Sequence, residues 1–192
     1  ALKNRLLENQ VTLTSEHYYS GSRLKIRYFL GFLVWPFGVM LAALRHRNRR
    51  WSMNIFWLFC IFLGLTFVIA SEGPDSARYA NTLKTFHSEG VTFSDITNSI
   101  YTPGSNFVDV VQPLLTWFIS LFTDNPSILL ACFALIFGFF YSRNLWYLLD
   151  KIDDKISPVT FVFILTFALI NPIWHINGFR MYTASQVFIY GL

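Results

Sequence analysis

Long apolar runs without charged side chains constrain this chain more than any other feature. The clearest run is Trp51 to Ser71, 21 residues that are mostly Phe, Leu, Ile and Trp. A helix of about 20 apolar residues is long enough to cross a hydrocarbon core of roughly 30 Å. Several such runs therefore predict an all-α fold, a polytopic membrane helical bundle with about 4 to 5 transmembrane helices.

The composition agrees with this fold class and excludes others. Hydrophobic residues make up 54% of the 192 residues and charged residues only 14%, whereas soluble domains carry about 25% charged residues. The same values exclude disordered and collagen-like chains and disulfide scaffolds. Cys60 and Cys132 both lie inside apolar runs, where a thiol packs as a small hydrophobic group, so they do not indicate a redox compartment.

The runs divide the chain into a polar, basic segment at 1–27 and a transmembrane domain at 28–192. The spans we expect are 28–44, 54–71, 126–149, 158–174 and an incomplete span at 180–192. Pro36 leaves two interpretations of the first span open, a true crossing or a re-entrant hairpin broken at the proline. Because the chain begins with Ala1 and stops inside an apolar run, we expect it to be a fragment of a longer protein.

The distribution of charge predicts the orientation. The chain has a net charge of +4, but nine of its fifteen basic residues lie in two places, five before residue 28 and four at 45–50. This clustering favours membrane topology over nucleic-acid binding, and it places the loop 45–50 in the cytoplasm. The loop 72–110, with five acidic and two basic residues, is then extracytoplasmic. A full crossing by 28–44 conflicts with the basic segment before it.

Residues 110–123 are uncharged but number only 14, which is short for a span. Gln112, Thr116, Ser120 and Thr123 form a polar stripe at helical spacing, so we expect an interfacial or re-entrant helix. If this helix does not cross the membrane, residues 175–180 lie on the same face as the loop 72–110. If it does cross, the two segments lie on opposite faces.

Motifs of familiar soluble enzymes are absent from the sequence. It contains no P-loop, glycine-rich dinucleotide turn, HExxH or GxSxG motif. The four His are scattered and neither Cys has a paired ligand nearby, so we expect no metal site and no cofactor. Asp150, Asp153 and Asp154 do not form a DxD motif, and a solvated loop is the simplest interpretation.

Arg180 follows an Asn177-Gly178 turn and opens the last apolar segment. The helix macrodipole opposes a cation in the first turn. The position becomes favourable if an anion is shared between the guanidinium and the free backbone amides. The alternative is an arginine that reaches the lipid headgroups.

A second cluster follows the span 54–71. Asp75, Arg78 and Tyr79 stand at i, i+3 and i+4, so they share one helix face. A carboxylate, a guanidinium and a phenol facing the headgroup layer have the chemistry to bind a sugar and a phosphate. An amphipathic surface helix with a capping aspartate would have the same pattern.

Four motifs in order resemble the EpsG-like, Wzy-type family of bacterial polysaccharide polymerases and related membrane glycosyltransferases. They are the basic stretch Arg45 to Arg50 before an aromatic span; Glu72-Gly-Pro-Asp75-Ser-Ala-Arg78-Tyr79; Gln112-Pro113-Leu114-Leu115 with Asn125-Pro126 after it; and Asn177-Gly178-Phe179-Arg180 followed by Ala184. The resemblance covers about residues 30–192. Met181 stands where family sequences often have Gln.

The resemblance implies synthesis of an exopolysaccharide or O-antigen-type polymer at the outer face of the bacterial cytoplasmic membrane. The substrates would be undecaprenyl-diphosphate-linked saccharides, without a nucleotide cofactor; the partners would be the lipid bilayer and other polysaccharide assembly proteins, and not nucleic acid. In this interpretation Asp75 is the base and Arg180 stabilises the leaving diphosphate. The residues expected to bind substrate are Arg78, Tyr79, His175 and Asn177, with His175 as the second candidate base.

Two other functions remain open at this stage. A polytopic transporter or flippase for lipid-linked sugars would also place an arginine beside a helix interrupted by proline. A non-catalytic subunit of a polysaccharide assembly complex would use the acidic loop 72–110 as a docking surface.

Overall fold

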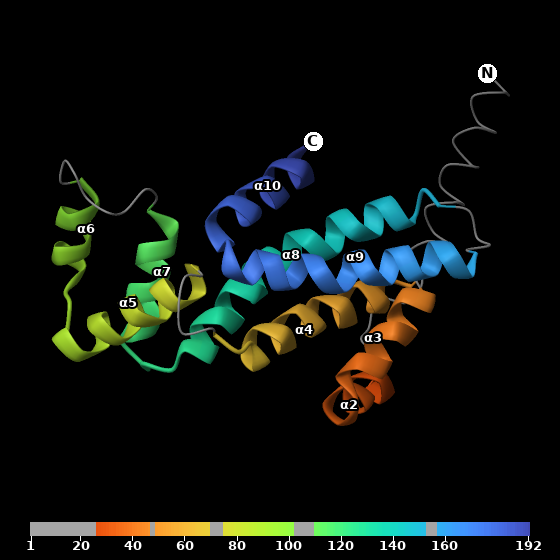
Figure 1. Cartoon of the computed structure of the whole chain (residues 1–192), viewed down its shortest axis with the longest axis horizontal. Coiled ribbons are helices and arrows are strands. Elements are labelled where there is room, and N and C mark those ends of the chain that lie inside the picture. The colour runs from red at the N-terminus through yellow and green to blue at the C-terminus, as the bar shows by residue number, and fades with distance from the viewer. Residues whose placement is uncertain (1–25, 47–48, 70–74, 102–109, 153–156) are drawn as a thin grey trace, which may run out of the picture.

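A computed structural model describes residues 26–46, 49–69, 75–101, 110–152 and 157–192 (Figure 1). Every regular element within these ranges is an α-helix, as the sequence predicts. The basic segment expected at 1–27 lies almost wholly outside the described residues. So do Glu72, the loop residues 102–109, and Asp153 and Asp154.

Three long helices form the centre of the fold: α4 (Arg50–Thr66), α8 (Pro126–Leu149) and α9 (Pro158–Asn177). α8 packs most extensively against α4 and also contacts α9 and α10 (Phe179–Gly191). Figure 1 shows α4, α8 and α9 side by side, with α10 beginning where α9 ends. The core between them is largely aromatic, with Phe56, Phe133 and Phe137 fully buried.

Small residues bring α4 and α8 close together. A Cβ atom at Gly64 would lie 2.7 Å from the carbonyl oxygen of Leu130, and one at Gly138 would lie 2.8 Å from the Cβ of Cys60. Trp57 Nε1 also donates a hydrogen bond of 2.9 Å to the carbonyl oxygen of Leu135. Close approach at small residues is a common way for apolar helices to associate.

The start of α8 and the start of α9 follow from capping. Both helices begin with proline at the first position, where the missing N–H would be unpaired anyway. Asn125 Oδ1 accepts a hydrogen bond from the amide of Ser127, and Ser157 Oγ accepts one from the amide of Thr160.

α9 extends further than the expected range 158–174. It passes through Pro172, whose ring removes one backbone hydrogen bond, and ends at Asn177. The extra turn is held by packing, because Ile176 and His175 are both buried against the core.

The span expected over 28–44, which the sequence left open as a crossing or as a hairpin broken at Pro36, consists of two helices. α2 (Ile26–Val34) has 9 residues and α3 (Pro36–Arg45) has 10, and the two contact each other and α4. The break falls at Trp35, because the residue before a proline is disfavoured in the helical region. Neither half reaches the roughly 20 residues that a straight crossing needs.

Two helices of the described residues, α8 and α9, are long and apolar enough to cross a membrane. They differ in their surroundings, since α8 is largely buried by its neighbours and α9 is largely exposed. Most of the exposed residues of α9 are apolar and lie at helical spacing: Val159, Val162, Phe163, Phe167, Ile170, Ile173 and Trp174.

Three shorter helices lie beyond one end of the long helices (Figure 1): α5 (Asp75–Glu89), α6 (Phe93–Tyr101) and α7 (Val111–Ser120). α7 packs mainly on α5. The polar stripe predicted on α7 is present, but it faces the protein: Gln112, Thr116 and Ser120 are buried. The exposed residues on and after α7 are apolar, namely Val111, Phe118, Leu121 and Phe122.

Candidate functional site

The candidate site lies where the start of α5, the end of α9 and the start of α10 meet on α8. Gly178 separates α9 from α10, and its amide donates to the carbonyl oxygen of Trp174. A Cβ atom at Gly178 would lie 2.7 Å from the Tyr182 ring, so the close approach of that ring requires glycine. Arg180 therefore stands in the first turn of α10, as the sequence predicts.

Three buried rings fix α5 and α10 on the same part of α8. The Tyr79 ring meets the Phe133 ring edge to face, with centroids 5.4 Å apart and planes at 89°. On Phe133 the Phe179 ring is stacked at 4.1 Å with planes 6° from parallel. All three side chains are at most 2% exposed. This packing brings the residues around 75–79 and 179–180 to one place.

The charged groups lie around the Tyr79 hydroxyl. Arg78 Nη2 and Asp75 Oδ1 form an ion pair of 2.9 Å, and both side chains are about half exposed. Burial raises the pKa of Tyr79 above its usual value, and the negative charge of Asp75 raises it further. The guanidinium groups of Arg180 and Arg78 act in the opposite direction on that pKa. Arg180 is thus close enough to Tyr79 to influence its ionisation.

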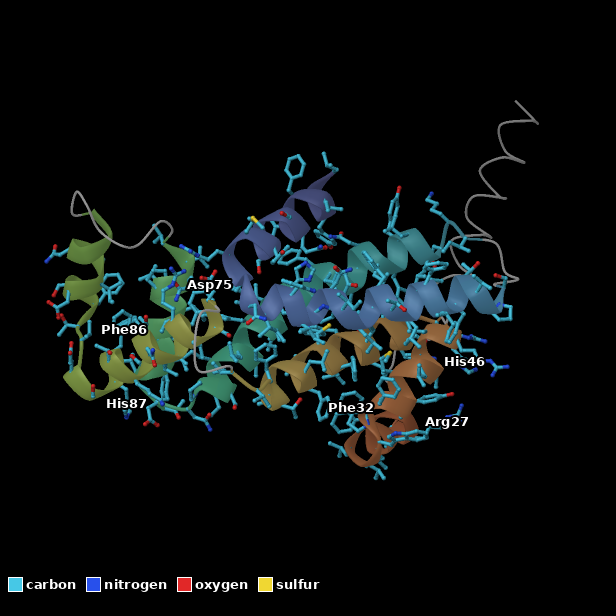
Figure 2. The ribbon with its side chains drawn as sticks, in the orientation of Figure 1. Arg27, Phe32, His46, Asp75, Phe86 and His87 are labelled. Carbon is cyan, nitrogen blue, oxygen red and sulfur yellow. The ribbon has the colours of Figure 1, made fainter. Side chains whose placement is uncertain are left out.

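Figure 2 shows Asp75 beyond the end of the long helices that lies away from His46, which follows α3. His46 and Arg45 begin the basic stretch 45–50. The candidate site and His46, near the start of this basic stretch, therefore lie beyond opposite ends of the long helices.

His175 lies in an aromatic surround near the end of α9. Its ring centroid is 5.3 Å from those of Phe137 and Tyr141 and 4.8 Å from that of Tyr182. The side chain is only 5% exposed. Its Nδ1 atom has no hydrogen-bond partner among the described residues.

Buried polar atoms without a hydrogen-bond partner concentrate at this site. Among the described residues such side-chain atoms are Ser76 Oγ, Tyr79 Oη, His175 Nδ1, Asn177 Oδ1 and Thr183 Oγ1. All of them belong to α5, to the last turn of α9 or to the first turns of α10. Most buried polar groups in proteins are hydrogen-bonded, so this concentration makes the region the candidate functional site.

No family model matches the chain, and no curated protein or solved structure is significantly similar to it. The resemblance described above thus rests on short motifs in order, and the site is interpreted from its own residues.

The structure brings together residues that the sequence placed in two separate clusters. Asp75, Arg78 and Tyr79 share one face of α5, and Arg180 approaches that face from α10. His175 and Asn177 lie at the same end of α9. Within the described part of the chain, no group of three or more His, Cys, Asp or Glu could hold a metal ion.

The sequence interpretation missed a second set of polar contacts, between helices far apart in the chain. Arg143 on α8 stacks over the Phe139 ring at 3.7 Å and reaches Asn54 Oδ1 of α4 at 3.5 Å. Asn144 Nδ2 donates to Gln186 Oε1 of α10 at 2.7 Å. Polar residues inside apolar runs are the signal that could have identified these positions. Ser76 and Thr183 were missed because nothing local distinguishes them.

Proposed function

We propose that this protein is a polytopic membrane glycosyltransferase that assembles surface polysaccharide from undecaprenyl-diphosphate-linked saccharides. It lies in the bacterial cytoplasmic membrane, and its site opens on the extracytoplasmic face. The spans are α4, α8 and α9, with the start of a further span in α10 and a helical hairpin at α2 and α3. With α10 counted, this proposal takes four spans, which lies within the range of about 4 to 5 that the sequence predicts.

The exposed surface supports the membrane location. α9 presents an apolar stripe from Val159 to Trp174, and a row of this length would be costly in water. α7 buries Gln112 and Thr116 and exposes Val111 and Phe118, which is the reverse of a helix at a water surface. The basic stretch 45–50 begins beyond the opposite end of the long helices, next to His46, and this supports an extracytoplasmic position for α5 and α10.

The observation that carries the proposed activity is the approach of Arg78 and Arg180 to one buried hydroxyl, that of Tyr79. Two guanidinium groups, each in the first turn of its own helix, form a site suited to a diphosphate. In the proposed reaction an acceptor hydroxyl attacks the anomeric carbon, a new glycosidic bond forms, and the bond from that carbon to the diphosphate oxygen breaks. The guanidinium groups stabilise the negative charge that develops on the departing diphosphate.

Asp75 accepts the proton of the attacking hydroxyl in this mechanism. In the structure its carboxylate is paired with Arg78 at 2.9 Å. A bound diphosphate competes for the same guanidinium and so releases the Asp75 carboxylate when substrate is present. The ion pair thereby couples substrate binding to the availability of the base.

The experiment is the replacement Arg180→Gln in the native host, with polymer yield and length measured on gels at matched protein level. We expect the yield to fall about 100-fold or more, which is the usual effect of losing a charge-stabilising donor. Lys84→Gln is the matched control, because Lys84 is an exposed cation on α5 outside the site. Unchanged polymer in the Arg180→Gln strain would contradict the proposed activity.

A further inference from the structure

The unpartnered polar atoms of Ser76, His175 and Thr183 have a chemistry different from that of the charged group beside them. A hydroxyl or a neutral imidazole offers no full charge to a diphosphate. Arg78 and Arg180 serve that purpose at the same site. The uncharged atoms are therefore suited to an uncharged part of a ligand.

Burial makes the lack of partners significant. Ser76 is 0% exposed and His175 is 5% exposed, and neither Ser76 Oγ nor His175 Nδ1 has a hydrogen-bond partner among the described residues. A polar atom buried in this way destabilises the folded protein compared with an apolar atom of the same shape. Such atoms are expected where a ligand supplies the missing hydrogen bonds.

The positions of these residues make them one group. Ser76 stands one helical turn before Tyr79 on the buried face of α5. Thr183 stands one turn after Phe179, whose ring stacks on Phe133. The Tyr79 ring also packs against Phe133, edge to face. His175 lies beside Tyr182, the residue that precedes Thr183.

We propose that Ser76, His175 and Thr183 form an uncharged subsite that binds hydroxyl groups of the saccharide next to the diphosphate. Sugar hydroxyls both donate and accept hydrogen bonds, which matches a set composed of two hydroxyls and an imidazole. The aromatic rings around His175 supply apolar surface for the C–H faces of a sugar ring. This inference rests on the proposed function, and it divides the site into a charged diphosphate part and a neutral saccharide part.

The test compares binding of two lipids to the purified protein in nanodiscs. One is undecaprenyl diphosphate, and the other is the same lipid carrying the saccharide that the native host attaches to it. The variants are Thr183→Val and Ser76→Ala, which remove a hydroxyl and keep the side chain close to its original shape. The thermal unfolding midpoint of each variant is measured in parallel.

We expect the ratio of the two affinities, saccharide-bearing lipid over bare lipid, to be about tenfold lower in each variant. A tenfold change corresponds to about 1.4 kcal/mol, the usual effect of losing one hydrogen bond. Binding of bare undecaprenyl diphosphate should not change. The unfolding midpoint should stay the same or rise, because an unpaired buried hydroxyl has been removed. A merely structural hydroxyl would show the reverse: a lower midpoint and an unchanged preference.

His175→Asn provides a second measurement, because the asparagine side chain can place a polar atom near the position of Nδ1. It should retain more of the saccharide preference than His175→Phe does. An unchanged preference in Thr183→Val, Ser76→Ala and His175→Phe would overturn the subsite and leave the proposed function intact. If Arg180→Gln bound both lipids as well as the unaltered protein does, the proposed function itself would be contradicted.

Discussion

The Phe179 ring lies on the Phe133 ring with centroids 4.1 Å apart and planes 6° from parallel. Phe133 belongs to the core helix α8, and Phe179 is the first residue of α10. Arg180 is the next residue, so this stack determines where its guanidinium group begins. An aromatic contact in the core thereby positions a charged group at the site.

We predict that Phe179→Ala lowers the free energy of unfolding by about 3 kcal/mol, since truncation of a buried phenylalanine typically costs that amount or more. It should also decrease polymer synthesis, because α10 loses its anchor on α8. Thermal unfolding in detergent gives the first quantity and gel analysis of the polymer gives the second. Phe188→Ala is the control on the same helix, since Phe188 is 68% exposed; it should change stability by less than about 0.5 kcal/mol.

The ionisation of Tyr79 tests the geometry independently of activity. Its pKa is raised above 10.0 by burial and by Asp75, and it is held back by Arg180 and Arg78. Asp75→Asn should therefore lower the pKa of Tyr79, and Arg180→Gln should raise it. NMR of the labelled Tyr79 phenol carbon measures both. If the pKa of Tyr79 in both variants were the same as in the unaltered protein, Arg180 and Asp75 would not face this hydroxyl.

The same shift has a consequence for stability. A phenol whose pKa is raised in the folded protein loses its proton first in the unfolded chain. The stability contributed by the Tyr79 phenol is complete below about pH 10, the pKa of an unperturbed tyrosine. It decreases as the pH rises through the pKa that Tyr79 has in the folded protein. Tyr79→Phe should remove that dependence on alkaline pH, and it keeps the ring on Phe133.

Local sequence rules predicted the elements that local interactions determine. α8 occupies 126–149 because a proline with an asparagine cap starts it and the apolar run continues to Leu149. The extension of α9 beyond Trp174 was not predictable in this way. It depends on Ile176 and His175 meeting side chains from other helices, which no single-segment rule contains.

The candidate site was predicted as two clusters, and only the fold relates them. Tyr79 and Arg180 are brought together by the Phe133 contact, which involves a third helix. The polar stripe of α7 shows the same limit. Its spacing was correct, but whether it faces water or α5 depends on the tertiary packing.

The close approach of α4 to α8 predicts a specific effect at Gly64. In Gly64→Ala the new Cβ would lie 2.7 Å from a backbone oxygen of α8, and backbone cannot move aside cheaply. We expect a loss of about 1 to 3 kcal/mol in unfolding free energy, as in other overpacked cores. Gly191→Ala is the control, because no atom lies within 4 Å of its new Cβ. Denaturation of both variants in detergent would show equal stabilities if α4 and α8 do not pack at Gly64.

The proposed orientation can be measured with single cysteines in a variant that lacks Cys60 and Cys132. Thr85 on α5 and Lys151 after α8 are both exposed, so each can be replaced by cysteine without disturbing the core. We expect a membrane-impermeant maleimide to label Thr85→Cys in intact cells and to label Lys151→Cys only after permeabilisation. This result follows if α8 crosses the bilayer between the two positions. Labelling of both cysteines in intact cells would mean that α8 does not cross the membrane. The proposal that the site on α5 and the basic stretch 45–50 lie on opposite faces of the membrane would then be contradicted.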